Sequence, residues 1–427
     1  MKKFYKLPLA LLALIFSTTV SAQNTSGVLV LNEGSFGVDN AGMSFLANGQ
    51  VHQQIYADAN NDVPLGNTAQ SMAFDNQYVY VVLNGSNALK VLDKQTLALH
   101  AIMPVGLFNP RFITLANGNA YITCWGDGGS ATDDYVAVVD LQSLSVTTTI
   151  PATEGVERII QIGDKLYVAN QGGYGYGNTV SVIDIATNTI SATIETGDVP
   201  NSITSDGNTL YVLCGGKPMW ATPETSGKLM KFNLADNSLI SEINFEGKHP
   251  SNLELYGDFL LFSIDTDIYK ITLGDTALPE NPLFSIDEVG SYGVYGMDVI
   301  GDEIYVADAA DYVSNGKALV YNMNGVLQNS YTVGVIPNGF YAADVLLATE
   351  NPNGVASISV FPNPATERFF INTDKNAAVK IYDISGRLVK SSAYNPSGIV
   401  VSDLNSGIYL VEITINDQKS IERISIK

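Results

Sequence analysis

The chain has 427 residues, of which 46% are hydrophobic and 15% charged, and its formal net charge is −21. This length is enough for more than one domain with a buried core. The acidic balance repels nucleic-acid phosphates and leaves no basic stripe, which argues against a nucleic-acid-binding protein.

Residues 1–22 have the pattern of a secretory signal peptide. A lysine-containing start, Lys2 to Lys6, precedes a short apolar run at 7–16, and small residues stand before Gln23. The run is too short for a membrane span, and no other apolar stretch reaches spanning length. No Cys follows the run, so a lipoprotein is not predicted. We expect a secreted or outer-membrane cell-surface protein, with no transmembrane segment in the mature chain.

One motif recurs along residues 24–345. It reads Leu-Tyr-Val or a close variant, and it is centred in turn on Tyr80, Tyr121, Tyr167, Tyr211, Leu261 and Tyr305. The spacing of 41 to 50 residues is that of four-stranded propeller blades. In the copy at 163–197, three segments (166–169, 179–184 and 189–194) are short, rich in β-branched residues and bounded by turn residues, which predicts strands.

Two incomplete copies stand at the ends of this region. Residues 28–32 resemble 79–84 but have no inner strand before them, whereas 335–341 resemble an inner-strand start with no continuation. Together they make one blade, so the sequence predicts an all-β fold with a seven-bladed β-propeller closed by both ends of residues 24–345. Closure removes the exposed sheet edges that favour aggregation.

The last part of the chain differs from the repeats. Residues 346–357 contain Asn351-Pro352-Asn353-Gly354 and indicate a linker. Residues 358–427 carry 8 Lys and Arg against 7 Asp and Glu, whereas residues 23–357 carry 11 against 36, a net of −25. The acidic surface of that larger part is consistent with solubility outside the cell.

Three motifs in residues 358–427 carry a resemblance. They are Ser359-Val360-Phe361-Pro362-Asn363-Pro364-Ala365, residues 379–389, and Leu404-Asn405-Ser406-Gly407-Ile408-Tyr409-Leu410-Val411. In this order they resemble the type A C-terminal sorting domain of the type IX secretion system of Bacteroidota. The resemblance implies a small immunoglobulin-like β-sandwich and the type IX secretion machinery as a partner.

The two cysteines, Cys124 and Cys214, each stand three residues after the repeat tyrosine, in copies that are not adjacent. Packed sheets lie about 10 Å apart, so two sheets of separation exceed the Cα distance of about 7 Å that a disulfide can bridge. We expect two buried free thiols.

The loops predict one binding face. In a propeller blade the loops between strands 2 and 3 and the connections between blades share one face, and here these are long and aromatic. Aromatic side chains on a rigid scaffold suit a sizeable organic ligand, although single aromatics often pack between blades. Two cations on this face could meet an anionic group or pair with a carboxylate such as Glu157. The candidate ligand-binding residues are Phe36, Phe108, Arg111, Trp125, Arg158, Tyr174, Tyr176, Trp220, Tyr292, Tyr295, Tyr312 and Phe340.

No catalytic or metal-binding motif stands out. The three histidines, His52, His100 and His249, lack metal-type spacing, and there is no Gly-x-Ser-x-Gly or Walker motif. Acidic loops at 127–134 and 308–311 do not fit known calcium patterns, so solvated loops are the better interpretation. We predict no cofactor and no catalytic residue, although carboxylates from different blades could converge at the channel mouth.

Residues 27–345 resemble YncE-like bacterial propellers, and most of all the cobalamin-capture surface propellers of Bacteroidota. The resemblance rests on four stretches: Val30-Leu31-Asn32-Glu33-Gly34-Ser35-Phe36-Gly37, Asn109-Pro110-Arg111-Phe112, residues 166–173 and residues 178–184. It implies capture of cobalamin or a related corrinoid beside an outer-membrane transporter. Those proteins are lipoproteins, whereas this chain has a sorting domain, and their ligand contacts do not transfer because the loops diverge.

Three classes of function follow. The first is non-enzymatic capture of a small organic ligand, with a corrinoid as the leading candidate. The second is a protein- or glycan-binding adhesin or scaffold, which a flat face without a deep central pocket would favour. The third is an extracellular propeller enzyme such as a lactonase, which carboxylates around a metal at the channel mouth would favour.

Overall fold

The computed structural model describes residues 23–103, 105–287, 290, 293–347, 360–371, 376–383, 387–394, 398–415 and 418–427. The predicted signal peptide and residues 348–357 of the predicted linker lie outside these ranges. The chain divides into two compact units, one spanning 22–347 and one that contains the described residues from 360 onwards.

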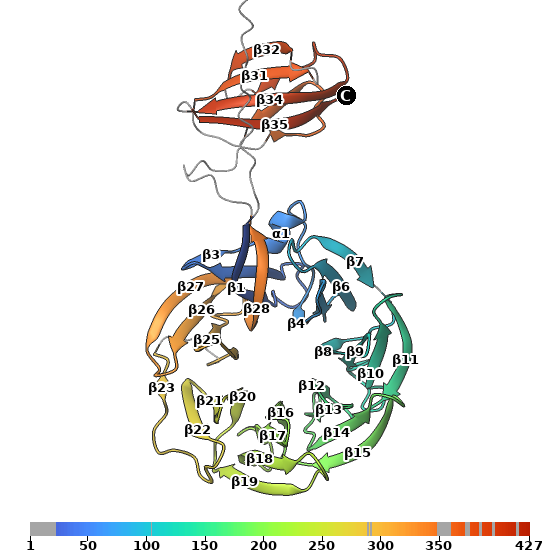
Figure 1. The fold of residues 1–427 in the computed structure, drawn as a ribbon, viewed down its shortest axis with the longest axis vertical. Helices are drawn as coiled ribbons and strands as arrows, with labels where there is room; N and C mark the ends of the chain where they lie inside the picture. The colour runs from blue at the N-terminus through green and yellow to red at the C-terminus, as the bar shows by residue number, and fades with distance from the viewer. Residues whose placement is uncertain are drawn as a thin grey trace, which may run out of the picture. The chain divides into compact units, whose positions relative to one another are not determined.

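The larger unit is a ring of four-stranded antiparallel sheets around a central channel, as in a β-propeller (Figure 1). Its described residues form seven such sheets. In each sheet the strands are given from the channel outwards. The first sheet contains β28 (Pro337–Leu347), β1 (Gln23–Asn32), β2 (Gly42–Ala47) and β3 (Gln50–His52), and the second contains β4 (Ala69–Phe74), β5 (Tyr78–Leu83), β6 (Ala88–Asp93) and β7 (Leu99–Met103). The third contains β8 (Pro110–Ala116), β9 (Asn119–Cys124), β10 (Tyr135–Asp140) and β11 (Ser145–Pro151), and the fourth contains β12 (Val156–Ile162), β13 (Lys165–Asn170), β14 (Thr179–Asp184) and β15 (Thr189–Glu195).

The remaining three sheets continue the ring in the same strand order. They are β16 (Pro200–Ser205), β17 (Thr209–Cys214), β18 (Gly227–Asn233) and β19 (Leu239–Phe245); β20 (Pro250–Tyr256), β21 (Phe259–Ile264), β22 (Asp267–Thr272) and β23 (Phe284–Ser285); and β24 (Gly296–Ile300), β25 (Glu303–Asp308), β26 (Asn315–Asn322) and β27 (Leu327–Val335). The short helix α1 (Ile55–Ala59) follows β3. It is too short to cross a membrane, and no other helix occurs among the described residues.

The two ends of the larger unit meet in one sheet. β28 pairs antiparallel with β1 from Gln23↔Leu347 to Asn32↔Pro337, with one irregularity near Asn32. The sheet is therefore built from both ends, as the two incomplete repeats predicted. It extends two residues beyond the predicted end at 345, because Leu346 and Leu347 continue the ladder.

Apolar clusters between neighbouring sheets hold the ring together. The middle strands read as nearly continuous apolar runs because both of their faces are covered. The repeat tyrosines are all at most 7% exposed. At two of them the phenol donates to the aspartate of the preceding turn, Tyr80 to Asp75 and Tyr211 to Asp206, each at 2.8 Å. The recurring Asp-containing turn and tyrosine are thus one structural unit that satisfies a buried hydroxyl.

The inner strands begin irregularly. The register between the first and second strands of a sheet shifts after Ala69, Pro110, Val156, Pro200 and Ser251. An extra residue in one strand re-aims the side chains beside it. In this ring it turns polar side chains at the start of the inner strands toward the channel.

The smaller unit has two sheets of its own. One contains β29 (Val360–Phe361), β30 (Arg368–Ile371) and β33 (Ile399–Val400), and the other β32 (Leu388–Ala393), β31 (Ala378–Asp383), β34 (Gly407–Ile415) and β35 (Gln418–Ile426). Residues of both sheets, among them Phe369, Ile381 and Val411, form one buried core. The predicted all-β character therefore holds for both units.

The ring closure makes Leu31 a sensitive position. Leu31 on β1 is fully buried in the cluster that also holds Met43 and Tyr56. We expect Leu31→Ala to lower the free energy of unfolding by about 2–5 kcal/mol, from lost burial and the cavity left behind. Leu239→Ala, at a half-exposed position on β19, should change it by less than about 0.5 kcal/mol. Equal urea midpoints for the two variants would contradict this role of the closing sheet.

Both thiols should be inaccessible in the native protein. Cys124 and Cys214 are free and fully buried, as predicted, and burial raises the pKa of each to about 12. We expect no alkylation of the folded protein at neutral pH, and two labels per chain in denaturant without reductant. Mass spectrometry reads both states. An unlabelled denatured chain would indicate a disulfide.

Candidate functional site

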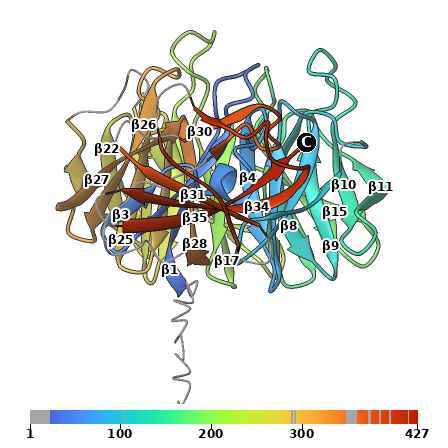
Figure 2. The ribbon, with the colours of Figure 1, turned by 90° about the horizontal axis from the view of Figure 1, so that it is seen from above.

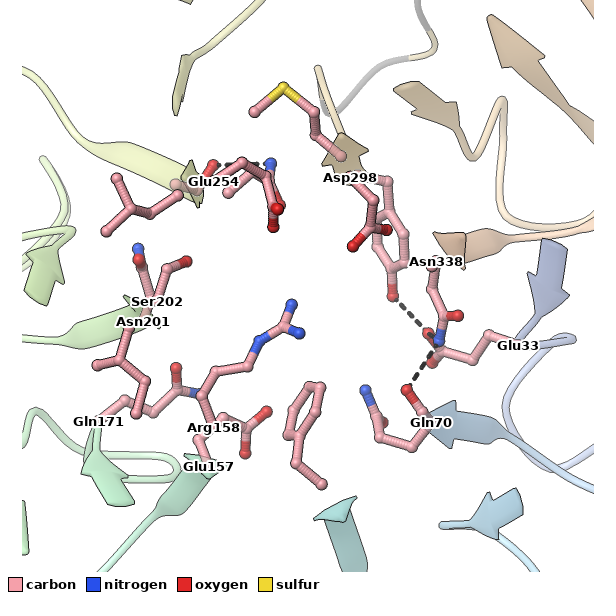
Figure 3. Close-up of a pocket in the computed structure, with 18 of the residues that line it drawn as sticks. Glu33, Gln70, Glu157, Arg158, Gln171, Asn201, Ser202, Glu254, Asp298 and Asn338 are labelled. Carbon is pink, nitrogen blue, oxygen red and sulfur yellow. Dashed lines mark hydrogen bonds between the residues drawn. The ribbon is translucent and has the colours of Figure 1, made fainter. Parts of the chain in front are cut away.

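A polar cavity of ≈ 280 Å³ occupies the channel (Figure 3). Each of the seven inner strands contributes at least one lining residue, so the ring itself assembles the cavity. The polar side chains around it are Glu33, Gln70, Glu157, Arg158, Gln171, Asn201, Ser202, Ser251, Asn252, Glu254, Asp298 and Asn338. Phe112, Tyr295 and Tyr341 are its aromatic members.

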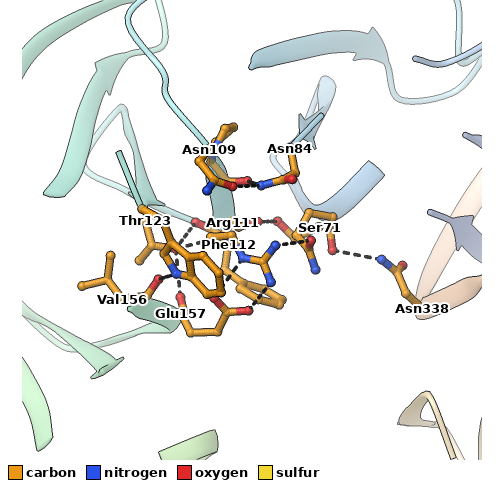
Figure 4. A network of polar contacts seen from close by, with 12 residues as sticks. Ser71, Asn84, Asn109, Arg111, Phe112, Thr123, Val156, Glu157 and Asn338 are labelled. Atoms are coloured by element: carbon orange, nitrogen blue, oxygen red, sulfur yellow. Dashed lines mark hydrogen bonds and ion pairs between the residues drawn. The ribbon is translucent and has the colours of Figure 1, made fainter. Parts of the chain in front are cut away.

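Arg111 is the centre of a polar network at the mouth of this channel (Figure 4). Its Nε and Nη2 donate to the carboxylate of Glu157 at 3.0 and 2.7 Å, and its Nη1 donates to Gln70 at 2.8 Å. The guanidinium lies 4.4 Å from the ring centroid of Trp125. Burial lowers the pKa of Arg111, but the adjacent Glu157 outweighs it and the net shift is upward. The pair therefore stays ionised, and Arg111 fulfils the second of its two predicted roles, pairing with a carboxylate.

Glu33 follows β1 and faces the same mouth. Its Oε2 accepts from the Tyr295 hydroxyl at 2.9 Å and from Asn338 Nδ2 at 3.4 Å. Burial raises the pKa of Glu33, and the hydrogen bond from Tyr295 offsets part of that rise. The carboxylate is thus held by neighbours on two other strands or loops of the ring.

A second group of charged side chains, Arg158, Glu254 and Asp298, comes from the inner strands β12, β20 and β24 and also lines the channel cavity. Figure 3 shows the Arg158 guanidinium pointing into the cavity, with the carboxyl groups of Glu254 and Asp298 opposite. Burial raises the pKa of Asp298 to about 7, although the Phe340 N–H donates to its Oδ2 at 2.8 Å. Burial and the neighbouring Asp298 also raise the pKa of Glu254 well above its ordinary value. Among the described residues, none forms an ion pair with Arg158, which stacks on Phe112 at 4.2 Å.

A separate, aromatic pocket of ≈ 490 Å³ lies on the loop face. It is lined by Phe36, Phe108, Trp125 and Tyr174, with Arg111 beneath them and Asn84, Asn87, Asn109 and Asp127 among the polar members. Phe36, Phe108 and Tyr174 are 85%, 62% and 81% exposed. Glu33 lines both this pocket and the channel cavity. We refer to the two below as the aromatic pocket and the channel cavity.

The local sequence explains how two of these aromatics are presented. Gly172 and Gly173 have φ of +100° and +58°, which L-side chains rarely adopt, and this turn directs Tyr174 outward. Trp125 is fixed by its indole N–H, which donates to the Val156 carbonyl at 2.8 Å, and by an edge contact with Tyr174 at 5.8 Å. The loops after β9 and β17 project from the same edge of the ring (Figure 2).

The twelve predicted residues fall into several groups. Phe36, Phe108, Arg111, Trp125 and Tyr174 line the aromatic pocket, and Arg158 and Tyr295 line the channel cavity. Tyr176 lines a third, shallower pocket of ≈ 310 Å³, and Trp220 is 79% exposed outside all three. Tyr312 packs edge-on against Tyr295. Tyr292 lies outside the described residues.

The prediction for Phe340 is wrong. Phe340 is 3% exposed and packs on Tyr305, with ring centroids 5.4 Å apart, in the cluster between the first and last sheets. It belongs to β28, where a register irregularity at Asn338 breaks the alternation, so that Asn338 and Tyr341 both line the channel while Phe340 faces the core. At this position the alternative expectation is confirmed: the aromatic side chain packs between neighbouring sheets and does not line the channel cavity or the aromatic pocket.

Sequence reasoning missed the carboxylates Glu254 and Asp298. The signal that could have found them is the register of the inner strands, because equivalent positions of every repeat face one channel. Placing the inner-strand starts side by side gives Gln70, Arg111, Glu157, Asn201, Ser251 and Asn338 as one polar ring. Glu254 lies three residues after Ser251, and Asp298 lies three residues after Tyr295, which lines the same cavity.

The acidic loops serve as turn caps. Asp134 is 3% exposed and accepts from Gly155 N at 2.7 Å; burial raises its pKa to about 6. Asp133 and Asp308 accept from backbone N–H groups of their own or neighbouring loops. Among the described residues, no group of three or more His, Cys, Asp or Glu is arranged to hold a metal ion. Residues 127–133 and Asp311 form solvated loops, as predicted, whereas Asp134 and Asp308 are buried.

Residues 26–333 match the family described as "Domain of unknown function (DUF5074)". The chain belongs to this family. Residues 359–427 match the secretion system C-terminal sorting domain, which confirms the type IX sorting domain predicted from the three motifs. The chain is therefore handled by the type IX secretion system, and its localisation is secreted or cell-surface.

Solved structures similar to this member of the family show the fold alone. A functionally unknown protein from Desulfotomaculum acetoxidans is 13% identical, with a TM-score of 0.57 over 75% of this chain and 99% of that one. A quinonprotein alcohol dehydrogenase-like protein from Bacteroides thetaiotaomicron is 17% identical, with a TM-score of 0.55 over 75% and 79%. A hypothetical selenium-binding protein from Sulfolobus tokodaii is 10% identical, with a TM-score of 0.56 over 78% and 96%.

Curated relatives match over short stretches. Ulvan lyase NLR42 of Nonlabens ulvanivorans is 36% identical over 70 residues, which is 15% of this chain and 13% of that protein. An endo-acting ulvan lyase of Formosa agariphila is 26% identical over 123 residues, 27% of this chain and 24% of that protein. The chain thus spans a quarter or less of the length of these relatives.

The raised pKa of Asp298 predicts a pH-dependent stability difference. From about pH 4 to pH 7 the unfolded Asp298 ionises while the folded one keeps its proton, so the native protein loses stability as pH rises through the folded pKa. Asp298→Asn, which keeps the acceptor for Phe340 N–H, removes this loss. We expect the variant to gain about 1–3 kcal/mol relative to the parent between pH 4 and pH 8 in urea unfolding.

Asp236→Asn is the matched control for this measurement. Hydrogen bonds from Ser238 lower the pKa of the exposed Asp236, so its replacement should shift relative stability in the opposite direction. A parallel pH dependence of the Asp298→Asn variant and the parent would show that Asp298 is ionised in the folded protein at pH 5.

Proposed function

We propose that this chain is a secreted or surface-attached seven-bladed β-propeller that captures an organic ligand in the aromatic pocket. The aromatic pocket is the observation that carries the proposal. Three exposed aromatic side chains and one partly buried indole, from loops of different sheets, border one depression on a rigid ring. Large exposed aromatics gathered in one place are costly to leave in water and mark binding surfaces.

The charge of the pocket narrows the ligand class. Arg111, the cation beneath the aromatics, already donates to Glu157 and Gln70 and is covered by Trp125. The charge of Arg111 is therefore neutralised within the protein. The described residues of the pocket present aromatic ring faces and amide groups to a ligand, and no unpaired guanidinium. A large ligand with extended apolar faces and peripheral amides fits this description, and a corrinoid is the first compound to test.

A glycan is the second candidate, favoured by a specific feature of the same pocket. Asn84, Asn87, Asn109 and Asp127 line it together with the aromatics. Planar amide and carboxylate groups beside aromatic faces suit a sugar, whose hydroxyls need hydrogen bonds and whose ring faces stack. The open, shallow form of the pocket accommodates a chain passing across it.

The remaining parts of the chain agree with a capture role outside the cell. We propose that the smaller unit is an immunoglobulin-like sandwich that delivers the propeller through the type IX system. An outer-membrane transporter that receives the ligand would then be the partner, as the resemblance to YncE-like capture propellers implies.

The proposal predicts which aromatics matter for cyanocobalamin. We expect residues 23–427 to bind it with near-unit stoichiometry in isothermal titration. Replacing Phe108 and Tyr174 together by Ser should weaken binding at least tenfold, since each loses a stacking face and neither is buried. Trp220→Ser, an equally exposed aromatic outside the aromatic pocket, should change affinity less than about twofold.

The outcomes separate the two ligand classes. No binding of cyanocobalamin at micromolar concentration would rule out a corrinoid ligand. The parent, the double variant of Phe108 and Tyr174 and the Trp220→Ser variant are then titrated with oligosaccharides from marine and plant polysaccharides. Binding that depends on Phe108 and Tyr174 but not on Trp220 supports the glycan. An equal loss in the Trp220→Ser variant would place the ligand elsewhere on the loop face and overturn the proposal.

A further inference from the structure

Besides Glu157, which pairs with Arg111, the channel cavity is lined by charged groups of both signs. Arg111 and Glu157 neutralise each other through two hydrogen bonds. Among the described residues, Arg158 forms no ion pair, and it faces the cavity from β12. Glu254 and Asp298 face the same cavity from β20 and β24. One guanidinium thus lies across the cavity from two carboxyl groups, of which Asp298 also accepts the Phe340 N–H.

The three groups differ in their exposure to water. Arg158 is solvent-exposed within the channel, whereas Glu254 and Asp298 are partly buried, and burial of a carboxyl group favours its protonated form. Burial raises the pKa of both carboxyl groups and Arg158 offsets part of that rise, so a cationic group bound between them would favour their ionised form. The guanidinium of Arg158 lies over the Phe112 ring, 4.2 Å from its centroid, and this contact favours its direction into the cavity.

We propose that the channel cavity binds a small zwitterion, with its carboxylate on Arg158 and its ammonium group between Glu254 and Asp298. A simple anion would gain Arg158 but face the carboxylates, including Glu33. A simple amine would gain the carboxylates but face the guanidinium. A molecule with both groups satisfies both sides, as fixed charge pairs do in complementary interfaces.

The size and the walls of the cavity define the ligand class further. Its volume of ≈ 280 Å³ is at the lower end of the range for ligand pockets, so the ligand is a free amino acid or a compound of similar size. Gln171, Asn201 and Ser202 add polar groups along one wall. Arginine is well suited to carboxylate recognition because its planar fork donates two parallel hydrogen bonds. The site is distinct from the aromatic pocket and does not depend on its ligand.

The ligand itself supplies the first test. Residues 23–427 are screened by thermal unfolding with each standard amino acid at millimolar concentration, because a ligand of the native state raises the unfolding temperature. The strongest hit is then titrated calorimetrically beside its decarboxylated amine and its deaminated acid. We expect the amino acid to bind at least tenfold more tightly than either analogue.

Two charge-removing variants test the assignment of the ends. Arg158→Gln should weaken the amino acid at least tenfold while leaving the amine unchanged or improved. Glu254→Gln should weaken the amino acid while leaving the acid analogue unchanged or improved. Glu242→Gln, the same replacement on the outer strand β19, should leave all three affinities unchanged, since Glu242 contacts Lys228 at the surface.

Several results would overturn the proposal. No response to any amino acid would show that the cavity takes no zwitterion of this size. Equal binding of the amine and the amino acid would leave a cation site only, and equal binding of the acid would leave an anion site only. Loss of corrinoid or glycan binding in the aromatic pocket has no bearing on these readouts, so the two proposals fail independently.

Discussion

The pairing of β1 with β28 is the constraint on which the rest of the larger unit depends. The first and last strands of residues 23–347 pair within one sheet, and this pairing closes the ring by backbone hydrogen bonds. The closure fixes the angular position of every inner strand. Because the channel is lined by all seven inner strands, a slip in this one ladder would displace side chains on both sides of the cavity.

Within the ring, polar side chains lie mainly on the inner strands and apolar side chains mainly on the second and third strands of each sheet. The second and third strands of each sheet carry apolar side chains on both faces and pack into the clusters between sheets. The inner strands have one face on the channel, so they can carry charges there at lower cost than in the packed core. The register shifts at their starts add to this, since they turn residues such as Gln70 and Arg111 toward the mouth.

The sequence was informative wherever a pattern repeats. The strands predicted at 166–169, 179–184 and 189–194 lie within β13, β14 and β15, because alternation and turn residues are local signals. The shared sheet of the two ends followed from two partial repeats. The partition of the aromatics did not follow: Phe340 and Phe108 both belong to predicted connections, yet one is buried and one 62% exposed. Phe340 lies within the inner strand β28 and faces the core, whereas Phe108 lies in the loop before β8.

The carboxylates of the channel were the harder part to predict. Glu254 and Asp298 are separated by more than forty residues, and neither belongs to a recognisable motif. Their approach follows from the ring geometry alone, which brings every inner strand to one axis. Arg111 and Arg158 illustrate the same limit, because the sequence left open whether each meets an anionic ligand or pairs with a carboxylate. One is tied to Glu157, and the other faces the cavity without an ion-pair partner among the described residues.

The two cavities therefore differ in the physical basis of selectivity. In the aromatic pocket the nearest cation is neutralised, so selection rests on ring faces and amide groups, which favour shape and size over charge. In the channel cavity the unpaired groups select by charge, and the walls leave room only for a small molecule. Glu33 lines both, held by Tyr295 and Asn338 rather than by a cation. The two linings share this one carboxyl group and otherwise come from different residues, so ring faces and amides select the ligand in one and charges select it in the other.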